Sequence, residues 1–248
     1  MENKKPLVRV TQIEQFRRYL QQSEFDNFEI TEQSVIDTIT GDFTGNQYTR
    51  IGTAFHSIVE SGKPQCQKAE AGVRTFTYYG RETTEPVPEG RTFDVDGYEV
   101  LLDVTQCRVA LDYRTEHPHA FHEIRLQKDY GDIIVTGQAD MIDGCEIHDI
   151  KTKFSSVRDT DYTSSYQCRM YLDIFGTDVF HYDFFEFKGY NIDKHGYDVR
   201  GLKLERRAPA ITCYRYPQMQ DDIMMLLDQF KDWVKQRDLT KYLLKDKI

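Results

Sequence analysis

The sequence predicts an α/β (α+β) protein in which a central mixed β-sheet is flanked by helices. Residues 121–154 contain three strand-like runs separated by short turns, and a helix-like segment lies on either side of them. A further strand-like run follows the second of these helices. The order helix, three strands, helix, strand favours a sheet with helices packed against its faces.

Apolar periodicity and turn residues define the individual elements. Helices are expected where apolar residues recur every three or four positions, and strands where apolar and polar residues alternate. Gly62 and Gly176 close two of the helices, because glycine is common just after a helix C-terminus. The segment TTEPVPEG, residues 83–90, is expected to be a surface loop. The expected helices are 10–22, 50–62, 97–118, 163–176 and 217–239, and the expected strands are 121–130, 132–143, 145–154 and 178–190.

We expect residues 1–248 to form a single domain. Its helical N-terminal part covers about 10–118, its core covers about 119–190, and a C-terminal helix covers about 217–239. The chain has no apolar run long enough to span a membrane, and its start, MENKKPLVRV, lacks the apolar stretch of a secretory signal. A soluble, cytoplasmic protein without a membrane partner is therefore expected.

Charge and cysteine content limit the classes of function. The net charge of -9 argues against nucleic-acid binding over the whole surface, because phosphate contacts need clustered Lys and Arg. Residues 188–207 carry six Lys or Arg against three acids, so this stretch is either a solvated loop or edge strand, or a flank that contacts phosphates. The five cysteines are scattered and form no CxxC pair, so they indicate neither a disulfide framework nor a zinc site.

The segment GQADMIDGCEIHDIKTKF, residues 137–154, predicts a β-hairpin. The Asp-Gly dipeptide at residues 143–144 is a strong signal for a two-residue turn. With this dipeptide at the tip, Asp140 faces Ile147 on the opposite strand. A shift of one residue in this register would move side chains to the other face of the sheet.

Asp140, Asp149 and Lys151 share one face of this hairpin, because side chains alternate with a period of two. The two carboxylates are then diagonal neighbours, with Cα atoms roughly 7 to 8 Å apart. They repel each other unless they are protonated or bridged by a cation, and hard oxygen ligands suit Mg²⁺ or Mn²⁺. A nearby ammonium can offset the charge that develops during phosphodiester hydrolysis. The alternative is a surface salt bridge, since the same acid-x-Lys triplet recurs at residues 186–188.

Five short segments form an ordered series of motifs: IGTAFHSIVE, HEIRL, GQADMID, HDIKTK and YQCRMY. In this order they resemble the histidine motif, the glutamate strand, the two catalytic strands and the Q-x-x-x-Y helix of the PD-(D/E)xK nuclease superfamily, in its RecB-like exonuclease branch. The resemblance extends from about residue 10 to residue 176. It implies a restriction-endonuclease-like core with the order α-β-β-β-α-β.

The resemblance also implies roles for individual residues. Asp140 and Asp149 would bind the metal together with the main-chain carbonyl of Ile150, and Lys151 would be the catalytic lysine. His56 matches the motif histidine, which is an additional metal ligand. From the residues alone, an exposed histidine at this position of a helix is unremarkable.

Four further residues are candidates for DNA binding or for support of the site. Gln167 and Tyr171 match residues that line the site and contact DNA, although a packed tyrosine and a solvated glutamine are the simpler interpretation without the resemblance. Glu123 approaches the same region from the neighbouring strand, or pairs with a nearby Arg or Lys. Glu60 lies one helical turn after His56 on the same flank.

The resemblance implies a Mg²⁺- or Mn²⁺-dependent deoxyribonuclease, an exonuclease of recombination or repair from a bacterial cell or from a phage that infects one. DNA is the expected partner, with a recombination protein and a homo-oligomeric ring as further partners by analogy. No iron-sulfur cluster is expected, because only Cys213 follows Cys168. The alternatives are an endonuclease with the same centre, and a nuclease-like module that binds DNA or protein without chemistry.

Overall fold

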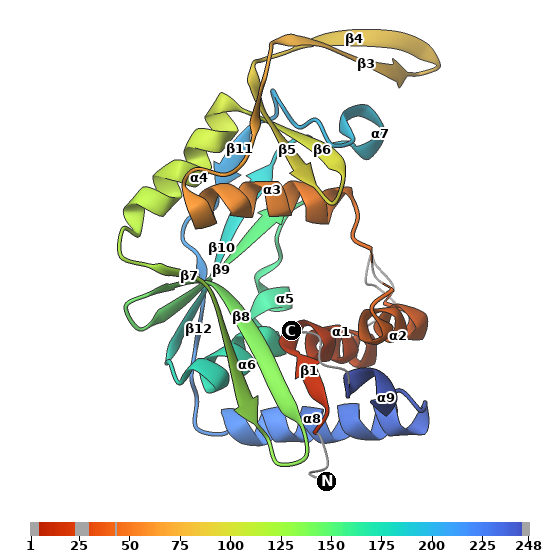
Figure 1. The fold of residues 1–248 in the computed structure, drawn as a ribbon, viewed down its shortest axis with the longest axis vertical. Helices are drawn as coiled ribbons and strands as arrows, with labels where there is room; N and C mark the ends of the chain where they lie inside the picture. Colours follow the sequence, from red (N-terminus) through yellow and green to blue (C-terminus); the bar gives the residue numbers. More distant parts are fainter. Residues whose placement is uncertain (1–4, 23–29, 43, 245–248) are drawn as a thin grey trace.

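The computed structural model describes residues 5–22, 30–42 and 44–244, and a mixed sheet of seven strands forms its centre. The strand order is β1-β8-β9-β10-β11, with β7 beside β8 and β12 beside β10. Neighbouring strands are antiparallel except for two parallel pairs, β1 with β8 and β9 with β10. The bounds are β1 Leu7–Arg9, β7 Phe121–Asp129, β8 Ile134–Asp143, β9 Glu146–Lys153, β10 Val179–Phe187, β11 Leu204–Arg206 and β12 Ile211–Tyr214. The predicted mixed sheet flanked by helices is confirmed (Figure 1).

One face of the sheet packs against α1, α6 and α8, and we call it the α6 face (Figure 1). Ile147 of β9 and Phe180 and Tyr182 of β10 are fully buried there. The short helices α2, α5 and α9 complete this side of the molecule. The bounds are α1 Val10–Gln21, α2 Glu32–Thr40, α5 Asp159–Thr163, α6 Tyr166–Phe175, α8 Met219–Gln236 and α9 Thr240–Leu243.

The opposite face packs against α3 and α4, and we call it the α3 face. Met141 and Ile150 are buried on this face, and the ring of Phe185 lies 4.6 Å from that of Phe55 on α3. A second, three-stranded sheet with the order β2-β5-β6 covers the same helices. The bounds are α3 Gln47–Ser61, α4 Val104–Glu116, α7 Ile192–His195, β2 Gln67–Ala69, β5 Gly90–Val95 and β6 Tyr98–Asp103.

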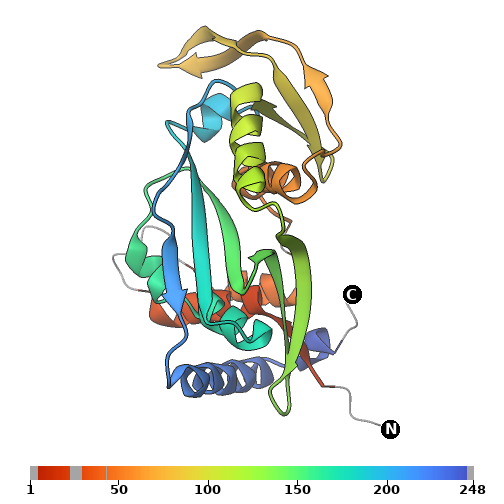
Figure 2. The same ribbon diagram turned by 90° about the vertical axis from the view of Figure 1, so that its left-hand side faces the viewer.

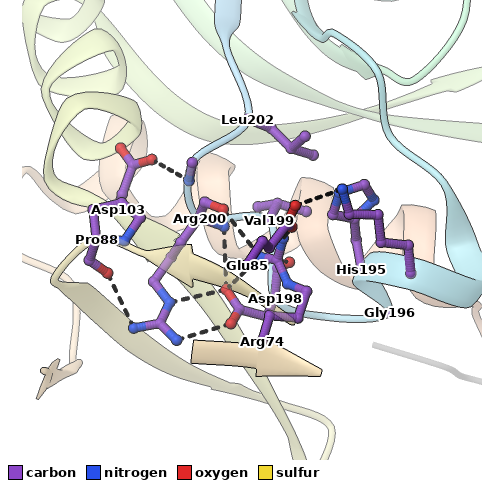
Figure 3. A network of polar contacts seen from close by, with 12 residues as sticks. Arg74, Glu85, Pro88, Asp103, His195, Gly196, Asp198, Val199, Arg200 and Leu202 are labelled. Carbon is purple, nitrogen blue, oxygen red and sulfur yellow. Dashed lines mark hydrogen bonds and ion pairs between the residues drawn. The ribbon is translucent and has the colours of Figure 1, made fainter. Parts of the chain in front are cut away.

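The hairpin of β3 (Gly72–Tyr78) and β4 (Arg81–Val87) extends away from the rest of the protein (Figures 1 and 2). A buried arginine network fixes its base (Figure 3). Arg74 on β3 bonds to Glu85 at 2.6 Å and donates to the backbone carbonyls of Asp198 and Arg200 at 2.7 and 3.0 Å. Arg200 in turn pairs with the Asp198 carboxylate at 2.8 Å. Charge-assisted bonds to backbone therefore anchor an element that has little apolar surface to bury.

The structure corrects the predicted helical N-terminal part at about 10–118, because residues 67–103 form five strands, β2 to β6. The predicted loop at 83–90 lies mostly in β4, and the predicted helix at 97–118 begins only at Val104. Asp103 ends β6 and caps α4, since its carboxylate accepts the N–H of Gln106 at 2.9 Å. Strand β4 has mostly exposed polar side chains, so periodicity does not reveal it. Strands β5 and β6 do bury alternate apolar residues, Phe93 and Val95 and then Val100 and Leu102, and the last two were assigned to the predicted helix.

Helix α3 approaches β9 closely at Gly52. A Cβ atom added to this residue would lie 2.8 Å from Oγ1 of Thr152. Thr152 directly follows Lys151 on β9, and His56 lies one helical turn after Gly52 on α3. The absence of a side chain at Gly52 therefore sets the distance between His56 and the residues of β9.

We expect Gly52→Ala to lower the free energy of unfolding by about 1–3 kcal/mol, because the added methyl group overpacks the contact with Thr152. Chemical denaturation of wild type and variant measures this loss. In a Thr152→Ala background the same change should cost nothing, or stabilise the helix by about 1 kcal/mol, since alanine is the better helix former. An equal loss in both backgrounds would contradict the proposed contact.

Candidate active site

Strands β8 and β9 separate just beyond their last paired position, and we call this opening the fork. Their pairing ends where Met141 lies opposite His148. At the next position, the carboxylate of Asp140 accepts a hydrogen bond from the backbone N–H of Ile150 at 2.7 Å. A side chain thus replaces the β8 backbone as the acceptor for β9, and this leaves a gap between the two strands.

The predicted register of this hairpin is wrong by two positions. Residues 144–145 form the tip, and Ile147 lies opposite Ile142 rather than Asp140. When this register is extended, Asp140 is level with Asp149. A shift by an even number keeps every side chain on its predicted face, which is why the predicted proximity of the two acids survives the error.

Residues from β7, β8, β9 and α6 line one cavity of about 330 Å³ at the fork. A larger hollow of about 480 Å³ between β12 and α8 has a less reactive lining, because its acid and base, Asp178 and Arg215, bond to each other at 2.9 Å. The predicted site residues in the wall of the fork cavity are Glu123, Asp140, Asp149, Lys151, Gln167 and Tyr171.

Asp149 is the most enclosed acid of the fork, with 4% of its surface exposed. Gln167 on α6 donates from Nε2 to Oδ1 of Asp149 at 2.9 Å. The ammonium of Lys151 lies 2.7 Å from Oδ2 of Asp149. Among the residues that the structure describes, however, none offers this buried Oδ2 a hydrogen bond of suitable geometry. Its one close partner among these residues is the Lys151 ammonium, and a bound cation would share the oxygen with it.

Burial disfavours the charged forms of the side chains at the fork. Burial raises the pKa of Asp149 to about 6, and the nearby Asp140 carboxylate adds to the rise. Burial also raises the pKa of Asp140. Burial disfavours the charge of Lys151, but the attraction of Asp149 and Asp140 outweighs it, so the pKa of Lys151 lies above its ordinary value. Two partly desolvated carboxylates share a single ammonium, so a further cation would be stabilising.

His56 on α3 reaches the fork from the other face of the sheet. Its Nδ1 lies 3.8 Å from Oδ2 of Asp140. Burial, followed by the charge of Lys151, lowers the pKa of His56 to about 4. The imidazole is therefore neutral at pH 7, which is the form that binds metals.

The donors at the fork fit a Mg²⁺ or Mn²⁺ ion. Asp140 and Asp149 supply carboxylate oxygens, Ile150, directly after Asp149, supplies a backbone carbonyl, and His56 supplies a nitrogen. Oxygen-rich sets of this kind suit these two metals. The specific feature that a cation would satisfy is the pair of desolvated carboxylates, Asp140 and Asp149, which share one ammonium.

Tyr171 forms part of the cavity wall and also supports β8. It is 4% exposed, and its hydroxyl donates to the carbonyl of Gln138 at 2.8 Å. Sequence reasoning assigned no role to Gln138, whose side chain bonds to both Glu123 and Arg125. Gln138 lies two residues before Asp140 on the same strand, and this spacing could have predicted that both side chains share a face.

Glu123 has an unusual backbone conformation, with a φ of 54° in the middle of β7. Such a positive φ is uncommon outside glycine and often marks a functional position. Burial raises the pKa of Glu123 to about 7, and the charges of Asp140 and Glu60 contribute to the rise. The structure thus brings Glu123 to the fork, while Glu60 stays on the exposed flank of α3 and acts on it through charge.

The basic stretch at residues 188–207 is not a free cationic surface. Each of its six Lys and Arg side chains forms an ion pair. The pairs are Lys188 with Glu186, Lys194 with Glu85, Arg200 with Asp198, Lys203 with Glu205, Arg206 with Glu116, and Arg207 with Asp159. These ion pairs neutralise the positive charge that the phosphate-contacting flank was predicted to offer. They favour the alternative, a solvated loop or edge strand.

Comparisons with known proteins add little to the geometry. No protein-family model and no curated protein matches the chain. A solved structure described as "Crystal structure of SSO0001" shares 15% sequence identity with a TM-score of 0.27, over 46% of this chain and 54% of that one. At this level the similarity carries no argument. In the described part of the chain, no helix has the length and apolar character that crossing a bilayer requires.

We expect Glu123→Gln to change the pH dependence of stability in metal-free buffer. An acid with a raised pKa in the folded state is most compatible with folding when protonated, so its contribution is lost as the pH rises from about 4.5 through about 7. The variant should therefore gain about 1 kcal/mol relative to wild type between pH 4 and pH 8, after allowance for solvent screening. Denaturant unfolding at both pH values measures this, and a difference independent of pH would contradict it.

Proposed function

We propose that this protein is a metal-dependent deoxyribonuclease of the PD-(D/E)xK superfamily that degrades DNA as an exonuclease. The finer proposal for its fold is a restriction-endonuclease-like core formed by α4, β7, β8, β9, α6 and β10. In support, β7, β8 and β9 are antiparallel in turn, and α6 connects β9 to the parallel strand β10. This is the order α-β-β-β-α-β that the resemblance implies.

The observation that carries the proposal is the fork. The buried Asp149, the partly buried Asp140 and the Lys151 ammonium line one opening between two strands, and a neutral imidazole approaches Asp140 from the other face of the sheet. A surface salt bridge, the alternative for the acid-x-Lys triplet, would leave Lys151 and Asp149 in solvent. Asp149 is instead buried, and Lys151 pairs with it inside the fork rather than in solvent. An arrangement that costs stability in this way is typical of a functional site.

Asp140, Asp149, the Ile150 carbonyl and His56 would hold Mg²⁺ or Mn²⁺, which supplies Lewis acidity toward a phosphodiester when it is bound. Lys151 would place its positive charge beside the phosphate, where negative charge develops as the P–O bond breaks. Gln167 would keep Asp149 in position through its bond to Oδ1. Tyr171 would hold the separated strand β8 through the Gln138 carbonyl.

Positive charge near the fork would contact the DNA backbone. Arg9 and Arg125 line the cavity together with Lys151. Lys153 follows on the same face of β9, and burial lowers its pKa to about 8, with the charges of Lys151 and Arg18 adding to the fall. A bound phosphate would relieve this repulsion. Such a substrate fits a role in bacterial or phage recombination or repair, with a recombination protein or further copies of the chain as partners.

We expect Lys151→Ala to lower Mg²⁺-dependent DNA cleavage by at least about 100-fold while metal binding persists. Asp140→Ala should abolish both, because it removes a ligand and the acceptor for Ile150. End-labelled DNA assays and calorimetric Mn²⁺ titration measure the two properties. Lys188→Ala is the matched control, since Lys188 belongs to the same acid-x-Lys pattern at a surface ion pair, and it should cleave as wild type does. Full activity of Lys151→Ala would contradict the assignment.

The exonuclease proposal predicts that linear duplex DNA is degraded with Mg²⁺, while covalently closed circular DNA stays intact. Gel analysis of linear, nicked, circular and single-stranded substrates measures this difference. Cleavage of the closed circle would identify an endonuclease with the same centre. If no substrate is cut and no Mg²⁺ or Mn²⁺ binds, the fold serves binding alone.

A further inference from the structure

A second cluster of ionisable side chains lies on β9 and β10, on the α3 face. Glu146, His148 and His181 each place one nitrogen or carboxylate oxygen within 4.8 Å of the others. Even-numbered residues of β9 point to this face, whereas Asp149 and Lys151 point to the α6 face. The cluster is therefore separate from the fork, although both use β9.

The parallel pairing of β9 and β10 brings these residues together. His148 and His181 are direct partners across the two strands, and Glu146 lies two residues before His148 on the same face. The imidazole rings stack with centroids 4.7 Å apart and an angle of 25° between their planes. The pairing of the two strands thus brings two imidazoles and a carboxylate together on one face of the sheet.

Hydrogen bonds orient His148 in the manner of a metal ligand. Its Nδ1 lies 2.8 Å from Oδ2 of Asp183. Asp183 is 2% exposed and is fixed further by the hydroxyl of Tyr113 at 2.9 Å. This contact leaves Nε2 as the nitrogen that faces His181 and Glu146, and metal-binding histidines commonly have such a carboxylate partner at the other nitrogen.

His181 and Glu146 keep the site accessible. Nε2 of His181 lies 2.9 Å from Oε2 of Glu146, and Nδ1 lies 3.0 Å from the hydroxyl of Thr212. The Glu146 side chain is 50% exposed and that of His181 is 18% exposed, so an ion can enter from solvent. The bond between them would be replaced by two bonds to the ion.

His117 lies beside the cluster with a nitrogen that lacks a partner. Its ring centroid is 4.8 Å from that of His148, and its Nδ1 lies 2.7 Å from Oδ2 of Asp143. Its Nε2 is buried, and no group in the described part of the chain bonds to it. A buried polar atom without a partner destabilises the fold, and a water molecule on a nearby metal would satisfy it.

We propose that Glu146, His148 and His181 form a second metal site, which binds a divalent transition metal of the Zn²⁺ class. Two imidazoles and one carboxylate are a ligand set that zinc uses with a fourth, open position. Imidazole favours Zn²⁺ and its transition-metal neighbours over Mg²⁺, so this site and the fork differ in their preferred ion. The ion would also tie β9, next to the hairpin tip, to β10.

Titration with Co²⁺, a coloured substitute for Zn²⁺, tests the proposal in the full-length protein with excess Mg²⁺ present to occupy the fork. One equivalent of Co²⁺ should give a visible absorption band that Zn²⁺ abolishes. Glu146→Gln and His181→Ala, at accessible positions, should each weaken binding by at least about 10-fold. His119→Ala is the matched control at an exposed histidine outside the cluster, and it should bind as wild type does.

A variant of the fork distinguishes the two sites. Asp149→Asn should lose the fork ion but keep the Co²⁺ band and the rise in melting temperature with Zn²⁺, about 5 °C at a concentration of 100 times Kd. His181→Ala should lose that rise. Binding by Glu146→Gln and His181→Ala equal to that of wild type would overturn the proposal, as would absence of the band in wild type or its loss in Asp149→Asn.

Discussion

The hydrogen bond from the Ile150 N–H to the Asp140 carboxylate is the interaction on which the fork depends. A buried backbone N–H must have an acceptor, and normally the neighbouring strand supplies it. Here the acceptor is a side chain, so β8 and β9 can separate without leaving this donor unpaired. The Tyr171 hydroxyl similarly satisfies the Gln138 carbonyl on the separated part of β8. The sheet thus opens at one point while these backbone groups remain bonded.

Burying charged side chains in the opening between β8 and β9 destabilises the fold. Asp140 and Asp149 enter a partly dry space with only Lys151 to balance them, and their raised pKa values reflect this. Replacing one partner of such a set leaves the other charges uncompensated. Because the sheet is packed on both faces, the strands resist rearrangement, and the charges must be satisfied where they are. A divalent cation is the simplest group that does so.

The sequence predicted which residues of β8 and β9 lie together at the fork, but not that the two strands separate there. Asp140, Asp149 and Lys151 are close because strand alternation has a strict period of two, and that period survived an error in the turn. The break in pairing was unpredictable, because it depends on a side chain that competes with backbone. The β3–β4 hairpin was missed because buried arginine bonds, rather than apolar alternation, hold it. Strand β6 was read as helix because Val100 and Leu102 directly precede the apolar residues of α4. The histidine cluster has no local signal, because β9 and β10 meet only in the folded sheet.

The distribution of charge explains how an acidic protein could act on a polyanion. The basic side chains of residues 188–207 form ion pairs with acids of the same protein, which neutralise their charge. Burial lowers the pKa of Lys153, and the positive charges of Lys151 and Arg18 add to the fall. Positive charges held close together destabilise the folded protein, and a bound phosphate backbone would reduce this repulsion. The attraction for DNA would then be concentrated beside the fork, while the acidic remainder of the surface would repel strands that approach elsewhere.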